Sequence, residues 1–99
     1  MEKIQKPEID RLLKTILKFE TFEECSNFFE DICTIKEIQD MSQRLEVARM
    51  LNKNKSYAEI SKETGASTAT ISRVNRSLSE DYDSCGGYIL VFNRLEGKK

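Results

Sequence analysis

Residues 57–76 read YAEISKETGASTATISRVNR, and this stretch decides the fold of the chain. Gly65 stands between two short segments whose apolar residues recur at helical spacing, so we expect a tight turn between two helices there. Ile60 and Ile71 are the apolar positions expected where the two helices cross, and the small Ser61 would allow a close approach. The stretch therefore predicts a helix-turn-helix.

We expect one face of the second helix to pack on the protein core and the opposite face to be exposed to a binding partner. Ser67 is expected to cap it, and Val74 and Leu78 would seat it on the core. The positions left exposed are short polar or small residues followed by two arginines: Ser67, Thr68, Ala69, Ser72, Arg73 and Arg76. Small side chains let a helix enter the major groove deeply, where hydroxyl, methyl and guanidinium groups contact bases and phosphates. These six residues are therefore predicted to bind double-stranded DNA, and a hairpin that merely packs is the alternative.

The charge distribution supports a polyanionic partner although the net charge is only −1. Residues 20–40 hold seven acidic side chains and one basic one, whereas residues 41–78 hold seven basic and three acidic ones. A basic half can face DNA while an acidic half is held away from it. A solvated surface of mixed charge is the alternative interpretation.

Capping signals predict helices in the rest of the chain. Pro7 suits the first position of a helix, and Thr21, Thr34 and Ser56 each stand three residues before a glutamate, which is the pattern of a capping box. The longest predicted helix follows Thr34 and closes within residues 52–55. Its expected inward face comprises Ile38, Met41, Leu45, Ala48 and Leu51.

In the C-terminal segment, residues 88–95 have both helical spacing and β-branched or aromatic character. We predict a helix, since a lone strand would have no partner in a helical chain. The expected fold class is all-α with about six helices in one domain, residues 1–99. Within it, residues 1–33 would be dimerisation helices, residues 34–78 the helix-turn-helix core and DNA-reading head, and residues 79–99 a C-terminal loop and helix.

Aromatic residues gather near the N-terminus, where four of the five phenylalanines fall between positions 19 and 29. One short helical hairpin cannot shelter so much aromatic surface, so we expect an association surface. The alternative is packing into the domain's own core. We expect a homodimer whose chains share one core, built on Ile9, Leu12, Ile16, Phe28 and Phe29.

Composition argues against catalysis and membrane insertion. The chain has no histidine, and its three cysteines lack the spacing of a metal or redox motif. We expect reduced thiols, no metal, no cofactor and no enzymatic activity. There is neither an apolar run long enough to span a membrane nor an apolar N-terminal signal, so a cytoplasmic protein is expected.

The stretch GASTATISRVNRSL (residues 65–78) and the preceding SQRLEVARML (residues 42–51) resemble the DNA-reading head of the Trp repressor family. The ending SLSEDYDSCGGYILVFNRL (residues 77–95) is similar to the YerC/YecD branch of Trp-repressor-like proteins. The resemblance implies an intertwined helical dimer that regulates transcription from a palindromic site. A protein-interaction module that uses the hairpin and the aromatic helices is the alternative function.

The resemblance also implies a small-molecule effector pocket, with one departure from the family pattern. Thr34, Arg44, Arg73 and Ser77 match the residue types that hold the indole in tryptophan-binding members. The position after the second arginine is glycine in those members and Val74 here. We therefore expect that L-tryptophan is not the corepressor. Either Val74 fills the pocket and DNA binding is constitutive, or a smaller effector of unknown identity binds.

Overall fold

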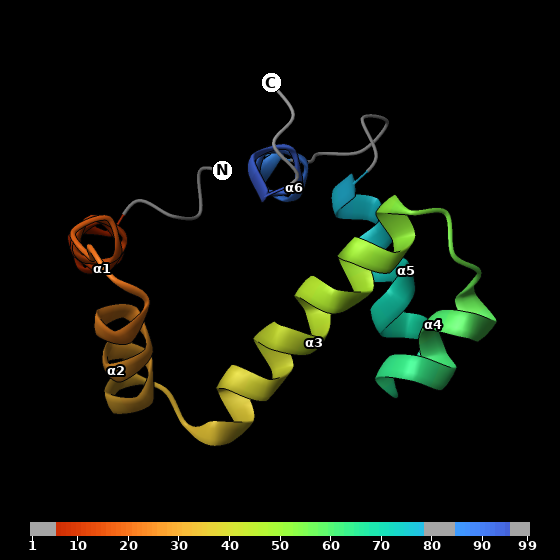
Figure 1. Cartoon of the computed structure of the whole chain (residues 1–99), viewed down its shortest axis with the longest axis horizontal. Coiled ribbons are helices and arrows are strands. Elements are labelled where there is room, and N and C mark those ends of the chain that lie inside the picture. The colour runs from red at the N-terminus through yellow and green to blue at the C-terminus, as the bar shows by residue number, and fades with distance from the viewer. Residues whose placement is uncertain (1–5, 79–84, 96–99) are drawn as a thin grey trace. The chain divides into compact units, whose positions relative to one another are not determined.

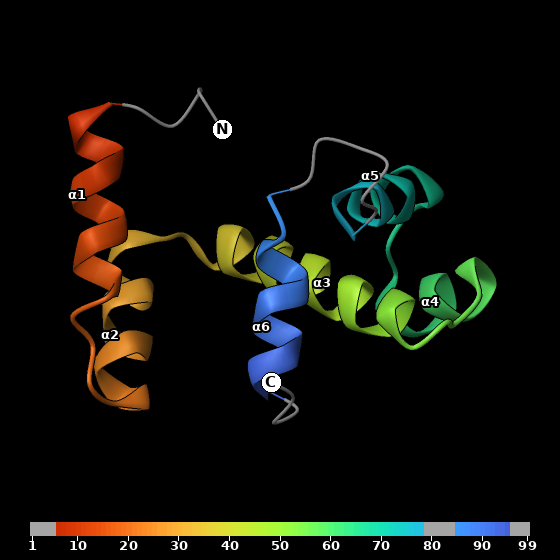
Figure 2. The same cartoon turned by 90° about the horizontal axis from the view of Figure 1, so that it is seen from above.

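A computed structural model describes residues 6–78 and 85–95 of the chain. These residues form six α-helices and no strand (Figures 1 and 2): α1 Pro7–Ile16, α2 Phe22–Ile32, α3 Ile35–Asn52, α4 Tyr57–Thr64, α5 Thr68–Leu78 and α6 Gly87–Leu95. The predicted all-α class is confirmed, and so is the helix expected over residues 88–95. Among the described residues, no helix is long and apolar enough to cross a membrane.

Reciprocal capping boxes begin α3 and α4, as predicted. The Glu37 N–H donates to Thr34 Oγ1 at 3.1 Å, and the Thr34 N–H donates to Glu37 Oε1 at 2.8 Å. Ser56 and Glu59 repeat both bonds, at 3.1 and 2.9 Å. The backbone N–H of Ser56, and then its hydroxyl group, hold the pKa of Glu59 below its usual value. The carboxylate needed for the box is therefore present at neutral pH.

The box at α2 differs from the prediction in one bond. Thr21 Oγ1 accepts from the Glu24 N–H at 3.0 Å, as expected for an N-cap. The Glu24 carboxylate, however, accepts from the N–H of Glu20 at 2.9 Å, one residue before the cap. The capping pattern located the start of α2 correctly although the return bond goes to a neighbouring residue.

Left-handed residues end α3 and α4. Asn54 has φ 64°, its N–H donates to the Leu51 carbonyl at 2.9 Å, and the Lys55 N–H donates to the Met50 carbonyl at 3.0 Å. This pair of bonds is a Schellman motif, which satisfies carbonyls that the helix end leaves open. Gly65 ends α4 with φ 76°, and a Cβ built there would meet no atom within 4 Å. Glycine is therefore favoured by the backbone conformation and not by lack of space.

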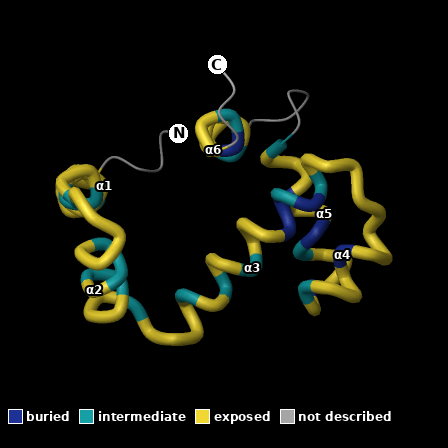
Figure 3. Tube along the Cα trace, viewed as in Figure 1, coloured by how far each residue is buried: buried dark blue, intermediate teal, exposed yellow. Residues whose placement is uncertain are grey.

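The chain divides into two compact units, Met1–Ile38 (the N-terminal unit) and Gln39–Lys99 (the C-terminal unit). In the N-terminal unit, the rings of Phe19 and Phe28 lie 5.1 Å apart between centroids. Neither α1 nor α2 has a buried residue (Figure 3). Leu17 is 82% exposed and Phe22 is 88% exposed.

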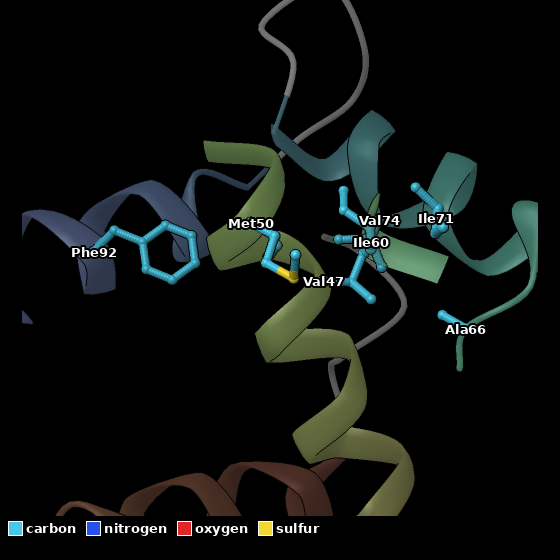
Figure 4. Packing of buried hydrophobic residues seen from close by; sticks show 8 residues of the cluster. Val47, Met50, Ile60, Ala66, Ile71, Val74 and Phe92 are labelled. Atoms are coloured by element: carbon cyan, nitrogen blue, oxygen red, sulfur yellow. The ribbon is translucent and has the colours of Figure 1, made fainter. Parts of the chain in front are cut away.

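The C-terminal unit contains the described hydrophobic core (Figure 4). Its members are contributed by α3, by α4 and the turn after it, by α5 and by α6: Val47, Ala48, Met50, Ile60, Ala66, Ile71, Val74 and Phe92. In α6, Tyr88 stacks on Phe92 with ring centroids 6.2 Å apart. No disulfide joins the three cysteines, which all lie within the described residues.

Two expectations about packing are wrong in detail. In α3, Met41 and Leu45 are exposed, whereas Val47 and Met50, which the predicted inward face omitted, are buried. The helix carries apolar residues on more than one face, so periodicity alone could not tell which face this chain's own core uses. Ser61, expected at the helix crossing, is exposed.

Candidate nucleic-acid interface

The hairpin of α4 and α5 is held by its apolar crossing and by hydrogen bonds around the turn. Ile60 and Ile71 are fully buried, which confirms them as the anchors. The Gln43 side-chain amide donates to the Thr64 carbonyl at 3.0 Å and ties α3 to the end of α4. Thr64 Oγ1 accepts from the N–H of the buried Ala66 at 3.1 Å. One hydrogen bond thus holds the turn to α3, and the other holds the two ends of the turn together.

Ser67 caps α5, as predicted. Its Oγ accepts from the Thr70 N–H at 3.1 Å and lies 3.2 Å from Thr70 Oγ1, to which it donates. The hydroxyl proton is thereby used within the cap. Of the six residues predicted to bind DNA, Ser67 thus contributes mainly by fixing the first turn of the helix that carries the others.

We call the six predicted DNA-binding residues the reading face: Ser67, Thr68, Ala69, Ser72, Arg73 and Arg76. All six are exposed, while Ile71 and Val74 on the other side of α5 are buried. Ala69 and Arg76 lie almost opposite the buried stripe at 100° per residue, and Thr68 and Ser72 form one border. The helix backbone therefore presents Thr68, Ala69, Ser72, Arg73 and Arg76 on one surface of the C-terminal unit, and Ser67 lies before the first residue of α5.

Sequence reasoning missed two residues beside this face. Asn75 Nδ2 donates to the Tyr57 hydroxyl oxygen at 3.3 Å, joining α5 to the first residue of α4. Asn75 continues the line of Thr68 and Ser72 at helical spacing, which is the signal that could have identified it. Tyr57 had no such signal, because its place beside the reading face depends on how the two helices cross.

The basic side chains of the C-terminal unit include one arginine in a surface ion pair and several exposed lysines. Arg49 is paired with Glu46 at 3.2 Å on the surface of α3. Lys53, Lys55 and Lys62 are exposed near the two ends of α4. A surface pair such as Glu46–Arg49 contributes little to stability, but it offsets the charge of that arginine.

A family model described as Trp repressor protein matches residues 7–93 of the chain. The chain belongs to the Trp repressor family. It is 52% identical over 96 residues to the YerC protein of Bacillus subtilis (strain 168), covering 97% of this chain and 89% of that protein. This family comprises regulatory DNA-binding proteins, which agrees with the exposed reading face.

Two solved structures have the same fold. A TrpR-like protein from Eubacterium eligens ATCC 27750 superposes with a TM-score of 0.89 at 45% identity, covering 100% of this chain and 99% of the other. A crystal structure of a Trp repressor candidate from Staphylococcus aureus gives a TM-score of 0.87 at 46% identity, covering 96% and 92% of the two chains. Both likenesses extend over nearly the whole chain, so the assignment does not rest on the hairpin alone.

The residues of the expected effector pocket are divided between the two units. Thr34 caps α3 in the N-terminal unit. Arg44, Arg73 and Ser77 are exposed in the C-terminal unit. Val74 is only 3% exposed and belongs to the core cluster. The side chain that departs from the family pattern is therefore used in packing.

Proposed function

We propose that this protein is a sequence-specific transcriptional repressor that acts as a homodimer on a palindromic DNA operator. The observation that carries the proposal is the two-sided helix α5, whose core side is buried while the whole reading face is exposed. A helix anchored in this way can enter a major groove without changing its own packing. A dimer would place two such helices about 34–36 Å apart, one turn of DNA.

Selection of bound sequences from random double-stranded DNA, with and without a mixture of cell metabolites, tests the proposal. We expect a palindromic sequence to be enriched. The complex should weaken steeply as salt rises, because lysines and arginines displace counterions from phosphates. Enrichment of no palindrome over random DNA would contradict the proposal.

Dimer formation is supported by the N-terminal unit. Without a buried residue, α1 and α2 gain little from apolar burial within one chain. The exposed apolar side chains of this unit, Leu12, Leu13, Leu17, Phe22, Ile32 and Ile35, are available to a second copy. We propose that two chains share a core there and that residues 1–33 are the dimerisation helices.

We expect no stable folded monomer. Because folding and association are then one equilibrium, the melting temperature should rise with protein concentration. Thermal unfolding measured over a hundredfold range of concentration checks this. Sedimentation that shows a folded monomer of 11.5 kDa at micromolar concentration would refute the dimer.

Replacing Arg73 with alanine is expected to lower affinity for the selected operator by about tenfold to a hundredfold, the range for losing one good base contact. Folding should be unchanged, because the side chain is exposed on the reading face. Mobility shift and circular dichroism measure the two quantities. Arg94→Ala, at an exposed arginine near the end of α6, is the matched control and should bind as the native protein does. Loss of helicity in Arg73→Ala would show instead that Arg73 supports the core.

The exposed apolar side chains of the N-terminal unit favour a second candidate function, a module that binds another protein. Leu17 and Phe22 are the most exposed of these residues. Complexes formed through such a surface should survive high salt, whereas a complex with DNA should not. Salt dependence therefore separates the two functions.

The last part of the proposal concerns regulation. Val74 occupies core space, so we propose that L-tryptophan is not the corepressor and that DNA binding is constitutive. A smaller effector held by Thr34, Arg44, Arg73 and Ser77 is the alternative. The metabolite arm of the selection experiment distinguishes these two cases.

A further inference from the structure

The hydrogen bond between Asn75 and Tyr57 joins two side chains at the surface. The Asn75 amide and the Tyr57 hydroxyl are 3.3 Å apart, they are 18 residues apart in the chain, and Tyr57 is 37% exposed. Water competes for both groups at such a site, so the bond adds little to folding stability. Where the bond forms, its effect is geometric, because the tyrosine oxygen accepts from Asn75 and its proton then points away from Asn75.

The bond places this hydroxyl at the border of the reading face. Thr68, Ser72 and Asn75 follow one another along α5 at the i, i+4, i+7 spacing of one helix surface. This line forms the border of the reading face on the side of α4, and Asn75 extends that border by one residue. If α5 lies in the major groove, a group beyond this border faces the sugar-phosphate wall of the groove and not its floor.

The donor pattern leaves the hydroxyl able to bind an anion. Because Asn75 Nδ2 donates, the Tyr57 oxygen is the acceptor, and its own proton remains available to another group. A phosphodiester oxygen can only accept. Lys53 and Lys55 precede α4 and are exposed, and together with the Glu59 carboxylate of the cap they leave one net positive charge in this segment. That charge favours a phosphate.

We infer that the Tyr57 hydroxyl donates a hydrogen bond to a phosphate of the DNA backbone and that Asn75 positions it. The inference rests on the proposed DNA-binding function. The contact would set how the hairpin is oriented on the duplex, because the same hydrogen bond connects the backbone contact to the reading helix. Contacts of this kind fix register and carry no sequence information themselves.

Tyr57→Phe tests the contact. We expect about tenfold weaker binding, by fluorescence anisotropy, to the selected operator and to random DNA alike. The slope of log affinity against log salt concentration should stay the same. Tyrosine carries no charge, so its contact with a phosphate displaces no counterion when the protein binds. Loss of a lysine or arginine that contacts a phosphate would instead reduce that slope. Tyr88→Phe, at the partly buried tyrosine of α6, is the matched control and should bind as the native protein does.

Asn75→Ala tests the positioning role. It keeps the hydroxyl but frees its direction, so we expect about a threefold loss of affinity. The double variant Tyr57→Phe, Asn75→Ala should lose about tenfold, the same as Tyr57→Phe alone, because a positioning residue has no effect once the positioned group is gone. Circular dichroism of each variant shows that the helices are retained.

The outcomes separate this inference from the proposed function. Native protein that binds no DNA overturns the proposed function and the inference together. Native protein that binds DNA, with Tyr57→Phe binding equally well, overturns the inference alone. A loss confined to the operator would show that Tyr57 reads bases, and additive losses in the double variant would show that Asn75 acts independently of the hydroxyl.

Discussion

Replacing Ile71 with aspartate is expected to unfold the helix-turn-helix. Ile71 is fully buried beside Ile60 in the core cluster, and the described core has no buried polar or charged residue that could pair with a carboxylate. Burying an unpaired charge there should lower the free energy of unfolding by about 4 kcal/mol or more. That amount is a large part of the stability of a small domain. Circular dichroism and thermal melting should show lost helicity, and binding to DNA should be lost with it.

Ser72→Asp is the matched control for Ile71→Asp. It adds the same charge one residue later, on the exposed reading face. This variant should keep its helices but bind DNA weakly, because the carboxylate would face phosphates. If both variants fold equally well, Ile71 does not anchor the hairpin. If both variants unfold, the burial of the Ile71 side chain is not the reason that Ile71→Asp unfolds.

Val74→Gly is expected to have the second large effect, because it removes three carbon atoms from the core and introduces glycine inside α5. Lost burial and lost helix propensity together should lower the free energy of unfolding by about 3 kcal/mol. Val74→Ala removes two carbon atoms without a loss of helix propensity, so its free energy of unfolding should fall by about half as much. Denaturant titration of the two variants measures this difference. Val74→Gly as stable as the native protein would show that the Val74 side chain contributes nothing to the core.

The same variant tests the regulatory proposal. In the native protein, an indole placed against α5 would have to displace the Val74 side chain, and overpacking of this kind costs about 1–3 kcal/mol. Each 1.4 kcal/mol lowers affinity about tenfold, so calorimetry should detect no micromolar binding of L-tryptophan. Val74→Gly, measured where it remains folded, should bind L-tryptophan more tightly than the native protein does. Native binding in the low micromolar range, coupled to tighter operator binding, would refute the steric argument.

Where the helices begin and end could be predicted because local groups decide it. The reciprocal bonds of Thr34 with Glu37 and of Ser56 with Glu59 join residues three apart, so the sequence pattern contains both partners. The left-handed backbone at Gly65 is likewise a property of one residue and its neighbours. The crossing of Ile60 and Ile71 followed from these boundaries, because a short turn leaves two short helices few ways to bury their apolar faces.

The sequence by itself thus determined the six helices, the hairpin and the exposed side of α5. All of these depend on residues that are close to one another in the chain. Tertiary structure decided which face of α3 packs, bringing in Val47 and Met50 and leaving Met41 and Leu45 exposed. It also decided that Tyr57 meets Asn75 across 18 residues. The spacing of residues shows whether one face of a helix is apolar or polar. Which other element packs on that face depends on how helices that are far apart in the chain cross one another.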